Sequence, residues 1–121
     1  MPQVQMFWRE KIAEYIGDHP EVEDQIETCI RTQMEKLVGI TNPHDLAFDS
    51  FIPDGASASA DGAIYISYSV REGGLVPVSA GDPEFTRRAA GEVLAALKNI
   101  LPKWTLGVWF IPYHNAGYTE G

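Results

Sequence analysis

Cysteine, histidine and basic residues are scarce in this chain. Its 121 residues include one cysteine, Cys29, three histidines, and nine lysines and arginines against seventeen aspartates and glutamates, which gives a formal net charge of −8. One cysteine excludes an intramolecular disulfide and fits a reducing compartment. The acidic balance argues against nucleic acid and against anionic membrane surfaces as partners, since both attract clustered lysine and arginine.

Long hydrophobic runs are also missing. Arg9, Glu10 and Lys11 interrupt the N-terminal segment, so we expect neither a membrane-spanning segment nor a secretory leader, and therefore a cytoplasmic protein. No spacing of histidine, cysteine and carboxylate residues suggests a metal site, and no cofactor is expected. With 45% hydrophobic and 21% charged residues, residues 1–121 are expected to form a single globular domain.

The first half of the chain predicts a strand, a long helix and a second strand. Apolar and polar residues alternate over residues 3–8, which is typical of a strand, although residues 6–16 can also be written as a helix. A helix of about five turns is predicted to begin at Pro20 and to end at Gly39. The apolar residues of the segment 46–52 mark the second strand, which a turn then ends.

The second half repeats this order. A strand is predicted over residues 63–71, with one apolar and one polar face. Asp82 is the predicted N-cap of the next helix, which Pro102 stops. Aromatic and β-branched residues predict a fourth strand over residues 106–111, and residues 113–120 form a polar and aromatic tail.

Two copies of a strand-helix-strand order predict an α+β fold built on a duplicated β-α-β unit (βαββαβ). Right-handed crossovers place both helices on one face of a four-stranded mixed sheet. The other face of the sheet then stays uncovered. Because a sheet buries its apolar face against another layer, this topology predicts that the chain forms oligomers.

Pro2 is a candidate catalytic base. Removal of Met1 turns its nitrogen into a free secondary amine, which can accept a proton when it is neutral. A pocket that also holds a cationic arginine disfavours the ammonium form and keeps the amine neutral. With Met1 attached the nitrogen is an amide and cannot act as a base. The sequence leaves open whether Met1 is removed.

The Met-Pro start, the chain length and the duplicated pattern together resemble the tautomerase superfamily. The segments that resemble its macrophage migration inhibitory factor branch are Phe-Ile-Pro-Asp at 51–54, residues 64–70, Arg-Glu-Gly-Gly at 71–74, the helix after Asp82 and residues 108–113. This resemblance implies a homotrimer and a cofactor-independent tautomerase or isomerase. It also implies that Pro2 is the general acid/base acting on a small 2-oxo or dienol carboxylic acid.

The resemblance implies further site residues. Arg9, after the first strand, sits where several superfamily members bind substrate with an arginine, and Arg71 resembles a second such position in the chloroacrylate dehalogenases. Tyr113 and Asn115 resemble tail residues that line the pocket. Glu120 resembles a residue that activates water in the dehalogenase branch. A surface role for Arg9 or for Arg71 and a solvent-facing tail are the alternatives.

Two departures from the family pattern bear on function. The segment 9–16 lengthens the interval before the long helix and is able to cover the pocket. Ile40 stands in the neighbourhood where the migration inhibitory factor branch has a lysine, which argues against phenylpyruvate-type recognition. Hydration, dehalogenation or decarboxylation of an unsaturated acid therefore stays an alternative reaction. A non-catalytic trimeric interaction protein is the alternative function.

Overall fold

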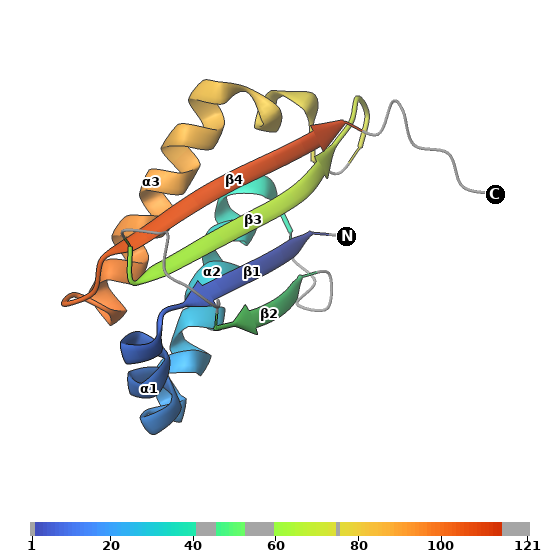
Figure 1. Cartoon of the computed structure of the whole chain (residues 1–121). Coiled ribbons are helices and arrows are strands. Elements are labelled where there is room, and N and C mark those ends of the chain that lie inside the picture. Colours follow the sequence, from blue (N-terminus) through green and yellow to red (C-terminus); the bar gives the residue numbers. More distant parts are fainter. Residues whose placement is uncertain (1, 41–45, 53–59, 75, 115–121) are drawn as a thin grey trace.

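The computed structural model describes residues 2–40, 46–52, 60–74 and 76–114, and of His114 only the backbone. The order of elements is β1 (Gln3–Trp8), α1 (Glu10–Asp18), α2 (Pro20–Val38), β2 (Ala47–Phe51), β3 (Gly62–Val70), the 3-10 turn η2 (Val78–Gly81), α3 (Pro83–Ile100) and β4 (Leu106–His114). Figure 1 shows one sheet with α2 and α3 packed behind it.

The sheet has the strand order β2-β1-β3-β4, in which β1 is an inner strand. β1 pairs with β2 and β3 pairs with β4 in parallel, whereas β1 and β3 are antiparallel. This is the mixed sheet expected from two β-α-β units. The predicted α+β fold, with its two long helices on one face, is therefore confirmed (Figure 1).

The N-terminal segment is a strand followed directly by a helix. β1 ends at Trp8, where the backbone N–H of Arg9 donates to the carbonyl of Asp61 at 2.9 Å. The helix α1 then begins and buries Ile12 and Ile16. The sequence left open a strand or a helix here, and the chain contains both. α1 is thus a third helix that the two-helix prediction did not include.

The core lies between the sheet and the two long helices. Each strand face that was predicted to be apolar is buried, and the buried residues of α2 and α3 follow helical spacing. The buried residues that define the two layers are Val4, Met6, Trp8, Ile64, Ile66, Tyr68 and Val70 from the sheet, and Val22, Ile26, Ile30, Met34, Ala89, Val93 and Leu97 from the helices.

The two edge strands differ from the prediction. β2 is shorter, and Ile52, which was expected to mark it, lies outside the strand with 67% of its surface exposed. β4 is longer and continues to His114, because it pairs along the whole length of β3. Tyr113 is therefore a strand residue and not part of a tail. Pro112 is tolerated in β4 because an edge strand has one side without sheet hydrogen bonds.

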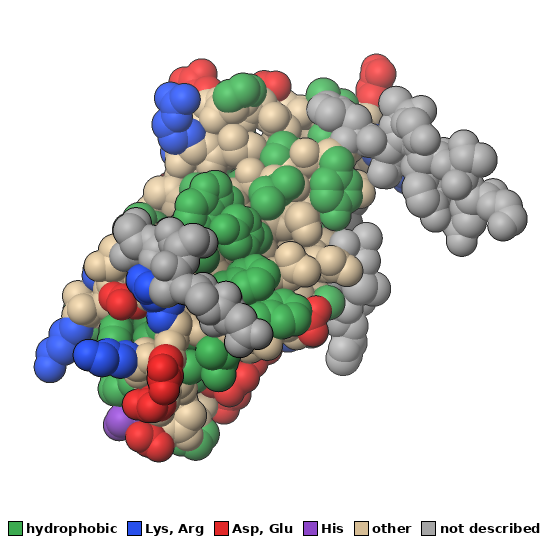
Figure 2. Space-filling model, in the orientation of Figure 1, with side chains coloured by type: hydrophobic (Ala, Val, Ile, Leu, Met, Phe, Trp, Pro, Cys, Tyr) green, Lys and Arg blue, Asp and Glu red, His purple; other side chains and the backbone are tan. Residues whose placement is uncertain are grey.

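The face of the sheet away from α2 and α3 carries a row of aromatic side chains, which we call the aromatic row: Phe51, Phe7, Tyr65 and Trp109. Successive ring centroids along the row are 5.1, 5.6 and 4.9 Å apart. The row crosses all four strands, and Figure 2 shows hydrophobic side chains gathered over this face. Phe51 and Trp109 remain 43% and 46% exposed. Large exposed apolar surfaces of this kind are typical of subunit interfaces.

Candidate active site

Pro2 lies at the start of the inner strand β1. Its carbonyl accepts a hydrogen bond from the backbone N–H of Ala47 at 3.2 Å, which ties the residue to β2. On the other side of β1, Gln3 pairs with Ser67 of β3, so Pro2 lies next to Tyr68 in the same register. Pro2 is half-buried. Pro2 therefore lies directly before β1 and is tied by its backbone to the start of β2.

Two other predicted site residues reach the same edge of the sheet. β3 runs antiparallel to β1, so the carboxyl end of β3 lies beside the start of β1 (Figure 1). Arg71 follows directly after β3, about 10 Å beyond the level of Pro2 along the strand direction, and it is exposed. Tyr113 pairs with Ser69 and is 45% exposed. The fold thus brings Pro2, Arg71 and Tyr113 to one edge of the sheet.

Arg9 lies at the opposite edge. It follows the carboxyl end of β1 and is the N-cap residue of α1. Seven residues of extended chain separate it from Pro2 by roughly 20 Å. Within one chain, Arg9 and Pro2 therefore cannot hold the same small substrate. α1 also starts at this opposite edge, so it does not cover the Pro2 of its own chain (Figure 1).

The other predicted site features fall outside the described residues or inside the core. Asn115, Glu120 and Met1 lie outside the described residues. Ile40 stands in the neighbourhood where the migration inhibitory factor branch has a lysine. Its side chain is buried, with 6% of its surface exposed. Within the described ranges no group of three or more histidine, cysteine or carboxylate residues is placed to hold a metal ion. None of the described helices is long and apolar enough to cross a membrane.

Tyr68, which is level with Pro2 in the strand register, has a buried side chain that ends in a hydroxyl. Its hydroxyl donates to the carbonyl of Ala80 in η2 at 2.6 Å, and the side chain is fully buried. Because burial disfavours the charged phenolate, it raises the pKa of Tyr68 to about 12. Tyr68 therefore joins β3 to η2, and its hydroxyl is engaged in that bond.

We expect the Tyr68→Phe substitution to change both stability and its dependence on pH. At pH 7 it should lower the free energy of unfolding by about 1–3 kcal/mol, because the carbonyl of Ala80 loses its partner. Between about pH 10, the ordinary pKa of tyrosine, and pH 12, the Tyr68 hydroxyl is protonated in the folded wild type and ionised in the unfolded chain. Unfolding in this range therefore releases a proton. Stability should therefore fall as pH rises through this window, by about 2–3 kcal/mol from Tyr68.

Urea unfolding of both proteins at pH 8 and pH 11 measures this effect. The difference in stability between wild type and Tyr68→Phe should shrink at pH 11. Tyr15→Phe is the matched control, since Tyr15 is half-buried and its ring lies tilted against that of His19, and it should keep the alkaline loss of the wild type. An unchanged difference at the two pH values would contradict the assignment.

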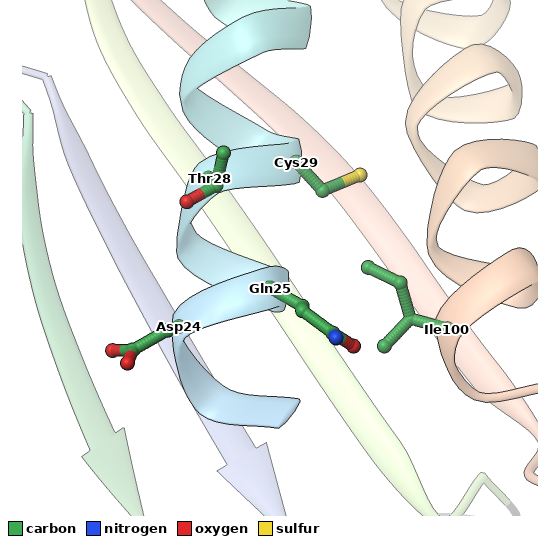
Figure 3. A pocket seen from close by; sticks show the side chains of 5 residues that line it. All are labelled: Asp24, Gln25, Thr28, Cys29 and Ile100. Carbon is green, nitrogen blue, oxygen red and sulfur yellow. The ribbon is translucent and has the colours of Figure 1, made fainter. Parts of the chain in front are cut away.

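A shallow groove between α2 and α3 is lined by Asp24, Gln25, Thr28, Cys29 and Ile100. Gln25 and Cys29 point from α2 toward α3, and Ile100 points back from α3 (Figure 3). Burial raises the pKa of the Cys29 thiol, so the reactive thiolate is disfavoured. Cys29 is half-buried and packs against the core.

A second hollow lies where α1 meets the carboxyl ends of β1 and β2. Its lining is apolar apart from Glu23 and Ser50. The residues that line it are Trp8, Ala13, Ile16, Gly17, Glu23, Ser50, Phe51 and Ile52. It lies at the sheet edge away from Pro2, and it offers no cation for an acidic substrate. Neither hollow is therefore a better candidate active site than the end of the sheet where Pro2, Arg71 and Tyr113 lie.

Solved structures, and not sequences, relate this chain to known proteins. No protein-family model matches the sequence, and no curated protein has a matching sequence. Among solved structures, a fused 4-OT protein determined as an asymmetric trimer matches 98% of this chain and 92% of its own, with a TM-score of 0.61 and 8% identity. This chain has the tautomerase fold.

Two further structures with that fold have named activities. FG41 malonate semialdehyde decarboxylase matches 98% of this chain and 88% of its own, with a TM-score of 0.56 and 12% identity. A 5-carboxymethyl-2-hydroxymuconate delta-isomerase matches 100% of this chain and 87% of its own, with a TM-score of 0.54 and 14% identity. The tautomerase fold thus carries both isomerase and decarboxylase chemistry. The resemblance inferred from the sequence is confirmed for the fold.

Proposed function

We propose that this chain is a cofactor-independent tautomerase or isomerase that acts on a small 2-oxo or dienol carboxylic acid. Pro2, freed by removal of Met1, is its general acid/base. The observation that carries the proposal is the hydrogen bond between the Pro2 carbonyl and Ala47, together with the place of Pro2 directly before the inner strand β1. A terminal amine held in the sheet keeps a fixed position, as a general base requires.

The proposed reaction moves one proton. The neutral amine of Pro2 takes a proton from the carbon next to the carbonyl, and the electron pair of that C–H bond forms an enolate. The ammonium of Pro2 then returns the proton to another carbon of the dienol. The substrate carboxylate binds Arg71, because a guanidinium binds a carboxylate through two parallel hydrogen bonds. Tyr113 lies at the same edge, where it lines the site.

The complete site requires more than one chain. Arg9 lies at the edge away from Pro2, so in this proposal it contributes to the site of a neighbouring subunit. The aromatic row supplies an apolar face for the association, and the fused 4-OT structure with the same fold is a trimer. We therefore propose a homotrimer. Asn115 and Glu120 are proposed to join this site from the C-terminal segment.

The alternative reaction is decarboxylation, which the similarity in fold to malonate semialdehyde decarboxylase favours. It differs from tautomerisation in that a C–C bond and not a C–H bond is broken. The alternative function is a non-catalytic trimer. The aromatic row fits this function equally well, so the state of the Pro2 nitrogen separates the two.

The deciding experiment compares two forms of the chain. Intact mass spectrometry first determines whether Met1 is removed. The processed protein is then assayed for tautomerisation of phenylenolpyruvate and 2-hydroxymuconate by ultraviolet absorbance, and for decarboxylation of malonate semialdehyde. The matched form carries one extra residue before Pro2, which turns its nitrogen into an amide and keeps every side chain. We expect tautomerase activity in the first form and a loss of about 10²-fold or more in the second.

Three results would contradict the proposal. Retention of Met1 in the protein purified from its native cells would remove the base. Equal activity of the two forms would show that the amine has no role. Decarboxylation without tautomerisation in the processed form would favour the alternative reaction on the same site.

A further inference from the structure

The turn after β3 holds the backbone of Arg71 at both of its polar groups. The N–H of Arg71 donates to the carbonyl of Val76 at 3.2 Å, and its carbonyl accepts from the N–H of Gly74 at 3.2 Å. The start of the Arg71 side chain is therefore fixed relative to the sheet. The long stem and the guanidinium beyond it need a separate restraint, since free rotation costs entropy when a ligand binds.

The two glycines of this turn differ in what they supply. Gly73 has a φ of +71°, a left-handed conformation that other residues rarely adopt, and the space around its missing side chain is open. Gly74 does not have a positive φ. A Cβ atom on Gly74 would lie 2.5 Å from Cγ, 2.9 Å from Nε and 3.3 Å from Cδ of Arg71. Gly73 thus allows the left-handed backbone conformation of the turn, whereas Gly74 leaves space that the side chain of Arg71 fills.

We propose that Gly74 is a positioning residue for Arg71. The stem of Arg71 lies across the bare backbone of Gly74, which limits its rotation and directs the guanidinium from the carboxyl end of β3. That end is the sheet edge of Pro2. Gly74 thereby sets how tightly the site binds the carboxylate of its substrate. This inference rests on the proposed function for the carboxylate, whereas the packing of Arg71 on Gly74 is independent of it.

Four variants separate the two glycines. Gly74→Ala displaces the stem of Arg71, and we expect it to raise KM for 2-hydroxymuconate about tenfold with kcat within about threefold of wild type. Gly73→Ala strains the turn without touching Arg71, and it should lower the thermal unfolding temperature and leave KM unchanged. Arg71→Ala should raise KM at least as much as Gly74→Ala. The double variant should be no worse than Arg71→Ala, since the two residues act through one group.

A second readout does not need activity. The Nε–H group of Arg71 is assigned in a ¹H–¹⁵N spectrum by its loss in Arg71→Ala. Relaxation of this ¹⁵Nε should show an ordered side chain in the wild type and in Gly73→Ala, and a more mobile one in Gly74→Ala. If the wild type has no tautomerase activity but Nε behaves in this way, the proposed function fails and the positioning of Arg71 stands. Unchanged Nε mobility in Gly74→Ala overturns the positioning, and additive KM effects overturn its role in binding.

Discussion

Replacing Pro2 with alanine is expected to lower kcat/KM by about 10²-fold or more, because a positioned general acid/base contributes about 10²–10⁴-fold. Alanine keeps a terminal amine, but the amine is primary and loses the rigid ring that fixes its direction. The carbonyl of residue 2 still accepts the hydrogen bond from Ala47. The loss should therefore appear mainly in kcat, with the folded structure retained. Steady-state kinetics with 2-hydroxymuconate measure it.

A control for this result is Glu35→Ala, on the exposed side of α2. It should leave kcat/KM within about twofold of wild type, as is usual for a substitution away from the site. Urea unfolding of both variants checks that Pro2→Ala is folded. Wild-type kinetics for a fully folded Pro2→Ala protein would show that the secondary amine of proline is not required for the reaction.

Placing a carboxylate in the aromatic row, by the substitution Trp109→Glu, is expected to convert the proposed trimer to monomers at micromolar concentration. The added carboxylate loses its hydrating water when this face is buried in an interface. That costs on the order of 3 kcal/mol or more at each interface, which is about 10²-fold in the dissociation constant. Activity should fall with assembly, because Arg9 lies roughly 20 Å from the Pro2 of its own chain.

Sedimentation velocity at matched concentrations measures this second prediction. The control is Ala95→Glu, which adds the same charge on the exposed side of α3 and should keep both the trimer and the activity. Circular dichroism checks that monomeric Trp109→Glu keeps its fold. A wild-type protein that sediments as a monomer, or a Trp109→Glu protein that stays trimeric, would refute the role of this face.

The fold was predictable where one face of an element is buried against another layer. Val4, Met6 and Trp8 alternate because α2 covers that face of β1, and this period of two is visible in the sequence. The helix α1 was ambiguous for a related reason. Apolar residues continue beyond β1 at Ile12 and Ile16, at the spacing of a helix. The segment 6–16 therefore fits a helix, although its first residues also fit the strand. The edge strands were misjudged because β2 and β4 expose apolar residues that normally mark a buried face.

The candidate site was predictable only in part. An antiparallel β1–β3 pair places the end of one strand beside the start of the other, so Arg71 and Pro2 share an edge by topology alone. The same topology separates Arg9, which follows β1, from Pro2, which precedes it. The sequence does not show whether Arg9 reaches the Pro2 of a second copy. Gly74 was not found, because a glycine pair in a sequence indicates a turn and does not show which side chain lies across it.

Pro112 has a consequence for how the chain associates. β4 is an edge strand, and a proline there removes one backbone donor from the row of groups that an added strand would bind. The exposed edge is thereby a poor template for open-ended strand addition, which is the first step of many aggregates. In the proposed trimer the contacts between copies are made instead by the sheet face that carries the aromatic row, and such an assembly closes at a fixed number of chains.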